Sequence, residues 1–177
     1  PLTNKISHAP GADTNVWVDL MLQPVRGDEV PELEETPQLA AYFNSNGLLT
    51  VYHRYFVDEF GVSTLDWTTL EHPPVPTGTW TRVTINIDYL TGDYGPDFPR
   101  LQFFQIMLHG GDPITNALAH SSPMAVMTST LPDGGSWFLL ANSDPTNTDG
   151  PWVDNMSALI LRGTGFMDDL VVTNGDV

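Results

Sequence analysis

The 177-residue chain contains no cysteine. Disulfide bonds, thiolate catalysis and zinc sites built on cysteine are therefore excluded. The absence leaves the cellular compartment open.

Basic residues are scarce. Lysine and arginine together number six, against 22 aspartates and glutamates, and the formal net charge is −16. Such a surface repels phosphate backbones and anionic lipid headgroups, which argues against nucleic-acid and membrane-surface partners. It suits divalent cations held by oxygen ligands. Acidity that serves only solubility is the alternative.

Long apolar runs and sustained helical periodicity are also missing. No stretch approaches the ~20 apolar residues needed to cross a bilayer, so we expect no membrane insertion. The sequence starts at Pro1 without an initiator Met, a basic region or an apolar leader, from which we expect a processed mature protein or an excised domain. With 41% hydrophobic residues, the length suits a single domain, residues 1–177.

Short segments with alternating apolar and polar residues lie between 15 glycines and 15 prolines. Residues 16–22 and 80–89 alternate clearly and predict half-buried strands. Residues 39–43 and 48–52 flank Asn46-Gly47, which predicts a hairpin. Further strands are expected at residues 101–108, 136–140, 157–161 and 166–173. Residues 117–130 are ambiguous and could hold a helical turn. Eight to eleven strands at this spacing predict an antiparallel, all-β sandwich.

Several stretches together carry a family resemblance. They are VWVDLMLQP (16–24), AYFN (41–44), GLLTVY (47–52), GTWTRVTI (78–85), FQI (104–106) and GTGFMDDLVVT (163–173). The chain resembles the laminin G-like, concanavalin A-like jelly-roll modules of bacterial secreted or surface proteins. The resemblance implies a two-sheet antiparallel jelly-roll sandwich with its first and last strands side by side. That adjacency would bring the Asp19 strand next to Asp168 and Asp169.

The resemblance covers lectins, adhesion modules and glycoside hydrolases, so it implies fold better than function. Hydrolases of this superfamily carry a Glu-x-Asp-x-x-Glu run on one strand, and nothing in the chain matches it. Asp168 and Asp169 are adjacent, so on a regular strand they point to opposite faces. The five histidines show no zinc spacing. We therefore expect a protein that is not an enzyme; hydrolase or lyase activity is the least favoured alternative.

Calcium is the expected cofactor, and the first candidate site is an oxygen-rich loop. Asp144, Asn147, Asp149 and Asp154 surround Gly150. Calcium takes six to eight oxygens from such loops, although the spacing is not that of an EF-hand. Asp and Asn also fill turns for their own local hydrogen bonds, which is the structural alternative.

The second candidate calcium site is Asp168 or Asp169, with Asp19. One aspartate of the adjacent pair should face the interior, where an unpaired carboxylate is costly. It would need a metal, an arginine such as Arg82 or Arg162, or backbone donors.

Aromatic residues beside loops are candidates for ligand binding, because a flat ring stacks on the apolar face of a sugar. The candidates are Trp67, Trp152, Tyr94 and Tyr55. For each one, packing within the protein is the alternative, and only clustering would favour sugar binding.

The sequence thus predicts an extracellular or cell-surface recognition and adhesion module that binds a glycan or a cell-surface partner, with calcium ordering its loops. The alternative is a structural subunit that assembles with copies of itself into a filament, tube or surface layer. Two features favour assembly: residues 53–56 could extend a strand beyond the sheet edge, and residues 1–15 could donate a strand to a neighbour.

Overall fold

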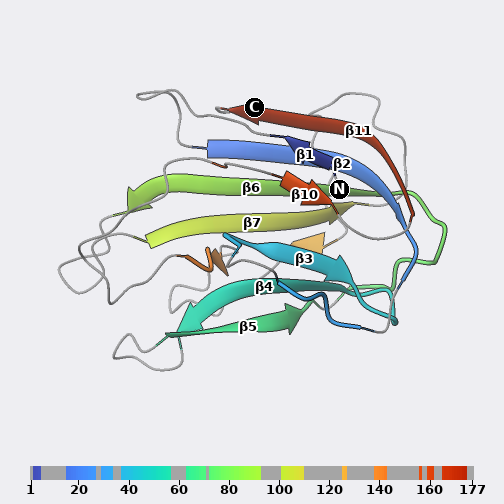
Figure 1. Cartoon of the computed structure of the whole chain (residues 1–177), viewed down its shortest axis with the longest axis horizontal. Coiled ribbons are helices and arrows are strands. Elements are labelled where there is room, and N and C mark those ends of the chain that lie inside the picture. Colours follow the sequence, from blue (N-terminus) through green and yellow to red (C-terminus); the bar gives the residue numbers. More distant parts are fainter. Residues whose placement is uncertain are drawn as a thin grey trace.

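A computed structural model shows an all-β fold (Figure 1). The structure describes residues 2–4, 15–26, 29–33, 37–56, 63–70, 72–92, 101–109, 125–126, 138–142, 156, 159–161 and 165–174. These residues form eleven strands and no helix, so none of them belongs to a helix that could span a membrane.

Every strand pairing in the described residues is antiparallel. The strands are β1 (Leu2–Asn4), β2 (Asn15–Pro24), β3 (Ala40–Phe43), β4 (Leu49–Phe56), β5 (Ser63–Thr69), β6 (Thr81–Gly92), β7 (Leu101–His109), β8 (Ala125–Val126), β9 (Phe138–Leu139), β10 (Leu159–Leu161) and β11 (Gly165–Asn174).

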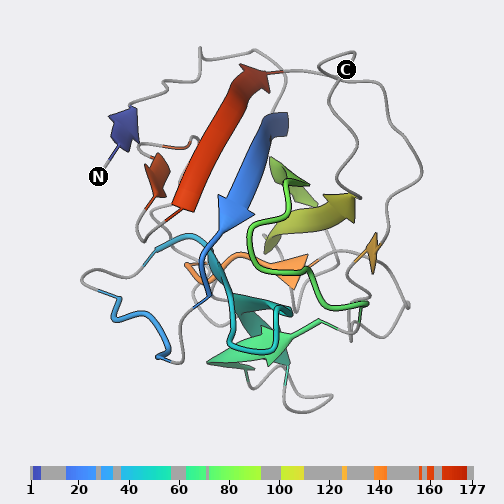
Figure 2. The same ribbon diagram turned by 90° about the vertical axis from the view of Figure 1, so that its right-hand side faces the viewer.

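Nine strands make one sheet, in the order β11-β2-β6-β7-β9-β4-β3, with β5 on β4 and β8 on β7. The remaining two strands, β1 and β10, pair with each other. Figure 2 shows that the large sheet is strongly curved, with β4 and β5 turned away from the plane of β11, β2 and β6. The described fold is thus all-β with two antiparallel sheets, as the sequence predicts at this level.

The inner face of the curved sheet carries the hydrophobic core. Alternation along β2 places Val16, Val18 and Leu20 on this face, each at most 2% exposed. They pack in one cluster with residues of β3, β4, β6 and β7, and Leu159 and Leu161 of β10 lie against the same cluster. Each fully buried aliphatic or aromatic side chain of this kind stabilises the fold by about 1.5–3 kcal/mol.

The outer face, opposite the core, is also buried over β2, β6 and β7. Met21, Phe103 and Met107 lie there with 5–8% exposure. The polar side chains of Asp19 and Thr84 are buried among them, each 1% exposed. The strands expected to be half-buried at residues 16–22 and 80–89 therefore have buried side chains on both faces. On the outer face, the polar side chains of Asp19, Arg82 and Thr84 bond to each other.

The predicted hairpin is confirmed as the β3–β4 pair. Asn44 Oδ1 accepts hydrogen bonds from the backbone of Asn46 and Leu48, at 3.0 and 3.1 Å. Gly47 has a φ of +76°, and a Cβ there would lie 2.5 Å from the carbonyl oxygen of Val75. Glycine is thus required both by the turn conformation and by the space available.

The predicted adjacency of the first long strand and the last is confirmed. β11 pairs with β2 along most of its length, and Val171 lies opposite Asp19. Between Asp168 and Val171 the register shifts at a β-bulge.

The structure bears on two features that favoured assembly. Residues 53–56 do not extend past the sheet, because β4 pairs with β5 throughout this part and with β9 at Arg54. Within residues 1–15, Leu2–Asn4 pairs with β10 of the same chain, and residues 1 and 5–14 lie outside the described residues. The described part of the ambiguous stretch, residues 125–126, is strand β8 rather than a helical turn.

Candidate functional site

Three aromatic side chains gather on the outer face of β3, β4 and β5. Tyr52 lies directly opposite Trp67, and Tyr42 is on the next row of the same face. The ring centroids of Tyr42 and Trp67 are 5.0 Å apart, edge to face at 89°. Those of Tyr52 and Trp67 are 5.3 Å apart and tilted by 52°. All three side chains are half-buried, so the indole contacts both tyrosine rings and still reaches solvent.

A row of hydrogen-bonding side chains borders these rings. Thr50 lies opposite Thr69 across β4 and β5, and their hydroxyl oxygens are 3.0 Å apart. The Asn44 amide donates to Thr50 Oγ1 at 3.2 Å, while its carbonyl oxygen is held by the hairpin turn. Tyr42, Tyr52, Trp67, Thr50 and Thr69 together are called the aromatic patch below. Its aromatic surface and oriented polar groups are the composition of small-molecule binding surfaces.

The ligand candidates from the sequence do not form one site. Trp67 is in the aromatic patch, whereas Tyr55 is on the inner face of β4 beside His53, at a centroid distance of 5.8 Å. Trp152 and Tyr94 lie outside the described residues. Sequence reasoning missed Tyr42 and Tyr52, although the alternation of their strands indicated them. Each is the chain neighbour of a core side chain, Phe43 or Val51, so its own side chain points to the outer face.

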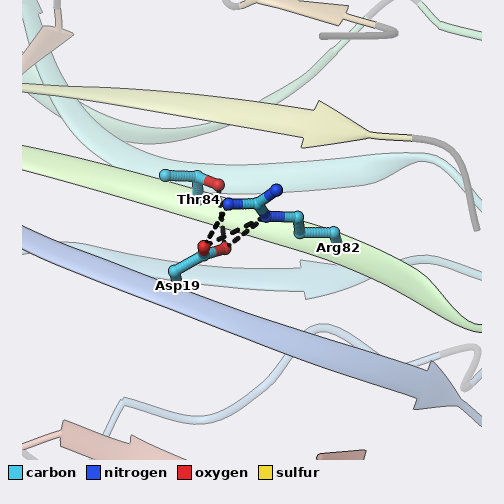
Figure 3. Close-up of polar contacts among 3 residues, drawn as sticks. All are labelled: Asp19, Arg82 and Thr84. Carbon is cyan, nitrogen blue, oxygen red and sulfur yellow. Dashed lines mark hydrogen bonds and ion pairs between the residues drawn. The ribbon is translucent and has the colours of Figure 1, made fainter. Parts of the chain in front are cut away.

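Asp19 is bound by a neighbouring arginine in the sheet. Figure 3 shows the guanidinium of Arg82 and the hydroxyl of Thr84 pointing at its carboxylate. Arg82 Nε lies 2.8 and 3.0 Å from the two carboxylate oxygens, and Arg82 Nη2 also donates to Oδ2. Thr84 Oγ1 donates to Oδ1 at 3.0 Å.

These bonds occupy both oxygens of the Asp19 carboxylate, and the positive charge of Arg82 compensates it. The residues therefore do not fit a calcium ion at Asp19. An arginine such as Arg82 was one of the partners expected for a buried carboxylate of Asp168 or Asp169. Arg82 pairs instead with Asp19.

Asp168 and Asp169 are both exposed, so the expectation that one of them faces the interior is wrong. The physical reason is the bulge: Asp169 has a φ of +50°, and its backbone N–H is 2.9 Å from Asp168 Oδ1. A bulge breaks the strict alternation of a strand, which places both carboxylates outside.

The oxygen-rich loop with Asp144, Asn147, Asp149 and Asp154 lies outside the described residues. Within the residues that the structure does describe, no three His, Asp or Glu side chains gather closely enough to hold a metal.

His53 is a buried titratable group on the inner face of β4, 3% exposed. Its Nδ1 donates to the carbonyl of Arg54 at 2.9 Å, and its Nε2 lies 2.8 Å from the hydroxyl of Thr68. Burial lowers the pKa of His53 below its usual 6.5, because desolvation disfavours the charged ring; the Arg54 carbonyl and the charge of Asp66 oppose this more weakly.

Comparisons with protein-family models, with curated proteins and with solved structures give no significant match.

Replacing Asp19 by Asn should lower the free energy of unfolding by about 3–5 kcal/mol, because Arg82 is left as an uncompensated buried charge. Urea denaturation measures this. The double variant Asp19→Leu with Arg82→Met should be more stable than Asp19→Asn alone, since it buries no charge. A loss upon Asp19→Asn that appears with calcium and vanishes in EDTA would show that Asp19 binds metal after all.

His53 should make the protein less stable in mild acid. Because its folded-state pKa is lowered, the unfolded chain takes up the proton first as pH falls below about 6.5. The stabilisation is complete above that pH and declines towards the folded-state pKa, by at most about 1.4 kcal/mol per pH unit. Urea unfolding of wild type and His53→Gln between neutral and mildly acidic pH measures it. Equal pH slopes for the two proteins would contradict it.

Proposed function

We propose that the protein is a non-catalytic recognition module, extracellular or at the cell surface, which binds glycans through the aromatic patch. The observation that carries the proposal is the contact of Trp67 with both Tyr42 and Tyr52, with hydroxyls alongside. An indole fixed by its neighbours loses little conformational entropy when a sugar ring stacks on it. The exposed hydroxyl of Thr69, oriented by its bond to the buried Thr50, supplies a directional partner for sugar hydroxyls.

The proposed fold behind this function is the concanavalin A-like jelly roll. The adjacency of β2 and β11 and the wholly antiparallel pairing support it. We propose no catalytic role, because the one carboxylate found fully buried in the described residues, Asp19, is bound by Arg82 and Thr84. Calcium remains part of the proposal through the loop around Asp144 and Asp149 and through the exposed carboxylates of Asp168 and Asp169.

A second candidate function is assembly with copies of the same chain, and β11 is the observation that favours it. In the described part of the sheet this ten-residue strand is an edge that pairs only with β2. Phe166 near its start is 70% exposed. The two carboxylates at the bulge would repel those of a second copy, and calcium between them would offset that repulsion.

Trp67→Ala should weaken glycan binding about tenfold or more, because it removes the central ring of the aromatic patch. The measurement is a glycan array with wild type, followed by titration calorimetry of a retained oligosaccharide. Tyr55→Ala is the matched control, since it removes an aromatic ring from the opposite face of the same sheet. An equal loss with both variants would mean that the effect is structural, and unchanged binding by Trp67→Ala would reject the patch.

Assembly through β11 should be calcium-dependent. Light scattering and negative-stain microscopy in millimolar calcium should show polymers that dissociate in EDTA. Asp168→Asn with Asp169→Asn should remove the calcium dependence, because the variant has no carboxylates at the bulge to repel or to bridge. A wild-type protein that is monomeric in both conditions would exclude this candidate function.

A further inference from the structure

Arg54 extends the aromatic patch by a positive charge. It lies on the outer face of β4, two residues after Tyr52 and opposite Leu65 of β5. Side chains two residues apart on a strand point to the same face, so Arg54 and the ring pair Tyr52–Trp67 lie on the same face of β4 and β5. Arg54 is half-buried, as Tyr52 and Trp67 are.

The guanidinium is held in place by backbone and hydroxyl groups. Its Nε and Nη2 donate to the carbonyl oxygen of Ala141 at 3.3 and 3.2 Å. Its Nη1 donates to Ser63 Oγ at 2.9 Å. A guanidinium has five N–H donors, so these three bonds fix its orientation and leave two donors available.

No carboxylate pairs with Arg54 in the part of the chain that the structure describes. Arg82, on the same face of the sheet, shows the contrast, because its charge is compensated by Asp19 at hydrogen-bonding distance. A partly desolvated, oriented cation that has no counter-charge among the described residues is a ready partner for an incoming oxyanion.

We propose that the glycan bound by the aromatic patch is acidic, and that Arg54 binds its carboxylate or sulfate group while a sugar ring stacks on Trp67. The inference rests on the proposed function and adds the chemical class of the ligand. Two remaining N–H donors match the two oxygens of a carboxylate or of a sulfate edge. The molecule as a whole carries a net charge of −16, which repels anions that lack this contact.

The dependence of the glycan affinity on salt concentration should show whether the ligand is held by one local contact. A polyanion held by a broad basic surface loses affinity steeply with salt. The affinity of a ligand bound by one arginine in an acidic protein should not fall steeply with salt, because salt also screens the repulsion by the surrounding carboxylates. We therefore expect the affinity for the acidic glycan to change little between low and physiological salt.

The test compares matched ligands on the full chain. The probes are uronic acid oligosaccharides of the gluco, galacto and manno series, each with its carboxyl-reduced neutral counterpart, and sulfated galactan with its desulfated form. Wild type should prefer an acidic member over its neutral partner by about tenfold or more, as expected for hydrogen bonds to a charged group. The carboxylated and sulfated arms distinguish the two sources of the oxyanion.

Arg54→Gln should abolish this preference and leave binding of the neutral partner unchanged. Arg54→Lys keeps the charge but not the fork of donors, and should restore only part of the preference. Arg26→Gln is the control for net charge, because Arg26 also donates to a backbone carbonyl, that of Val75, outside the patch. Thermal melting of each variant shows whether it is folded.

The outcomes separate the two proposals. Equal binding of acidic and neutral partners by folded wild type, with Arg54→Gln without effect, would overturn the role of Arg54 and leave glycan binding intact. No binding of any glycan would overturn both proposals. An equal loss of acid preference in Arg26→Gln would attribute the preference to net charge and reject a specific contact. If Arg54→Gln is unfolded, partial retention of the preference by folded Arg54→Lys supports the contact, and full retention overturns it.

Discussion

The buried ion pair between Asp19 and Arg82 is the constraint on which the central sheet depends. It joins β2 to β6 on the outer face, in the middle of the strands that also carry the core on their inner face. Placing two charges where exposure is 1% and 5% costs several kcal/mol per ion unless both are paired and hydrogen-bonded. The pair therefore favours one register of β2 on β6, because a slip of one residue would move Asp19 into the apolar core.

The outer face of the large sheet differs between two regions. Over β2, β6 and β7 most outer-face side chains are buried, and Asp19, Arg82 and Thr84 bond to one another there. Over β3, β4 and β5 Thr50 is buried, whereas Tyr42, Tyr52 and Trp67 of the outer face are half-buried. Large aromatic side chains on this second region are stabilised by cross-strand contacts with each other and still offer surface to a ligand. The aromatic patch thus lies where the outer face is open.

Sequence reasoning succeeded where alternation and turn chemistry agreed. The alternation of residues 16–22 predicted a strand and the Asn46-Gly47 turn predicted a hairpin, both at the observed places. Few structures other than a strand have a strict period of two, and few other than a tight turn need a positive φ. It missed β5, whose sequence STLDWTT holds only two apolar residues and depends on pairing with β4. It also misplaced Asp168 and Asp169, since a bulge with φ of +50° at a non-glycine residue leaves no clear sign in the sequence.

Sequence patterns do not predict which residues face each other across the sheet. These cross-strand neighbours determine the role of each arginine. Arg82 was correctly identified as a possible partner for a buried carboxylate, but only the β2–β6 register shows that the carboxylate belongs to Asp19. Arg54 and Arg82 both occupy polar positions of long strands, and the sequence around each of them does not distinguish their roles. The difference arises from their neighbours: Arg82 has an aspartate diagonally across the strand pair, whereas Arg54 has Leu65 and Leu139 opposite it. One arginine thereby stabilises the sheet, and the other has no carboxylate partner among the described residues.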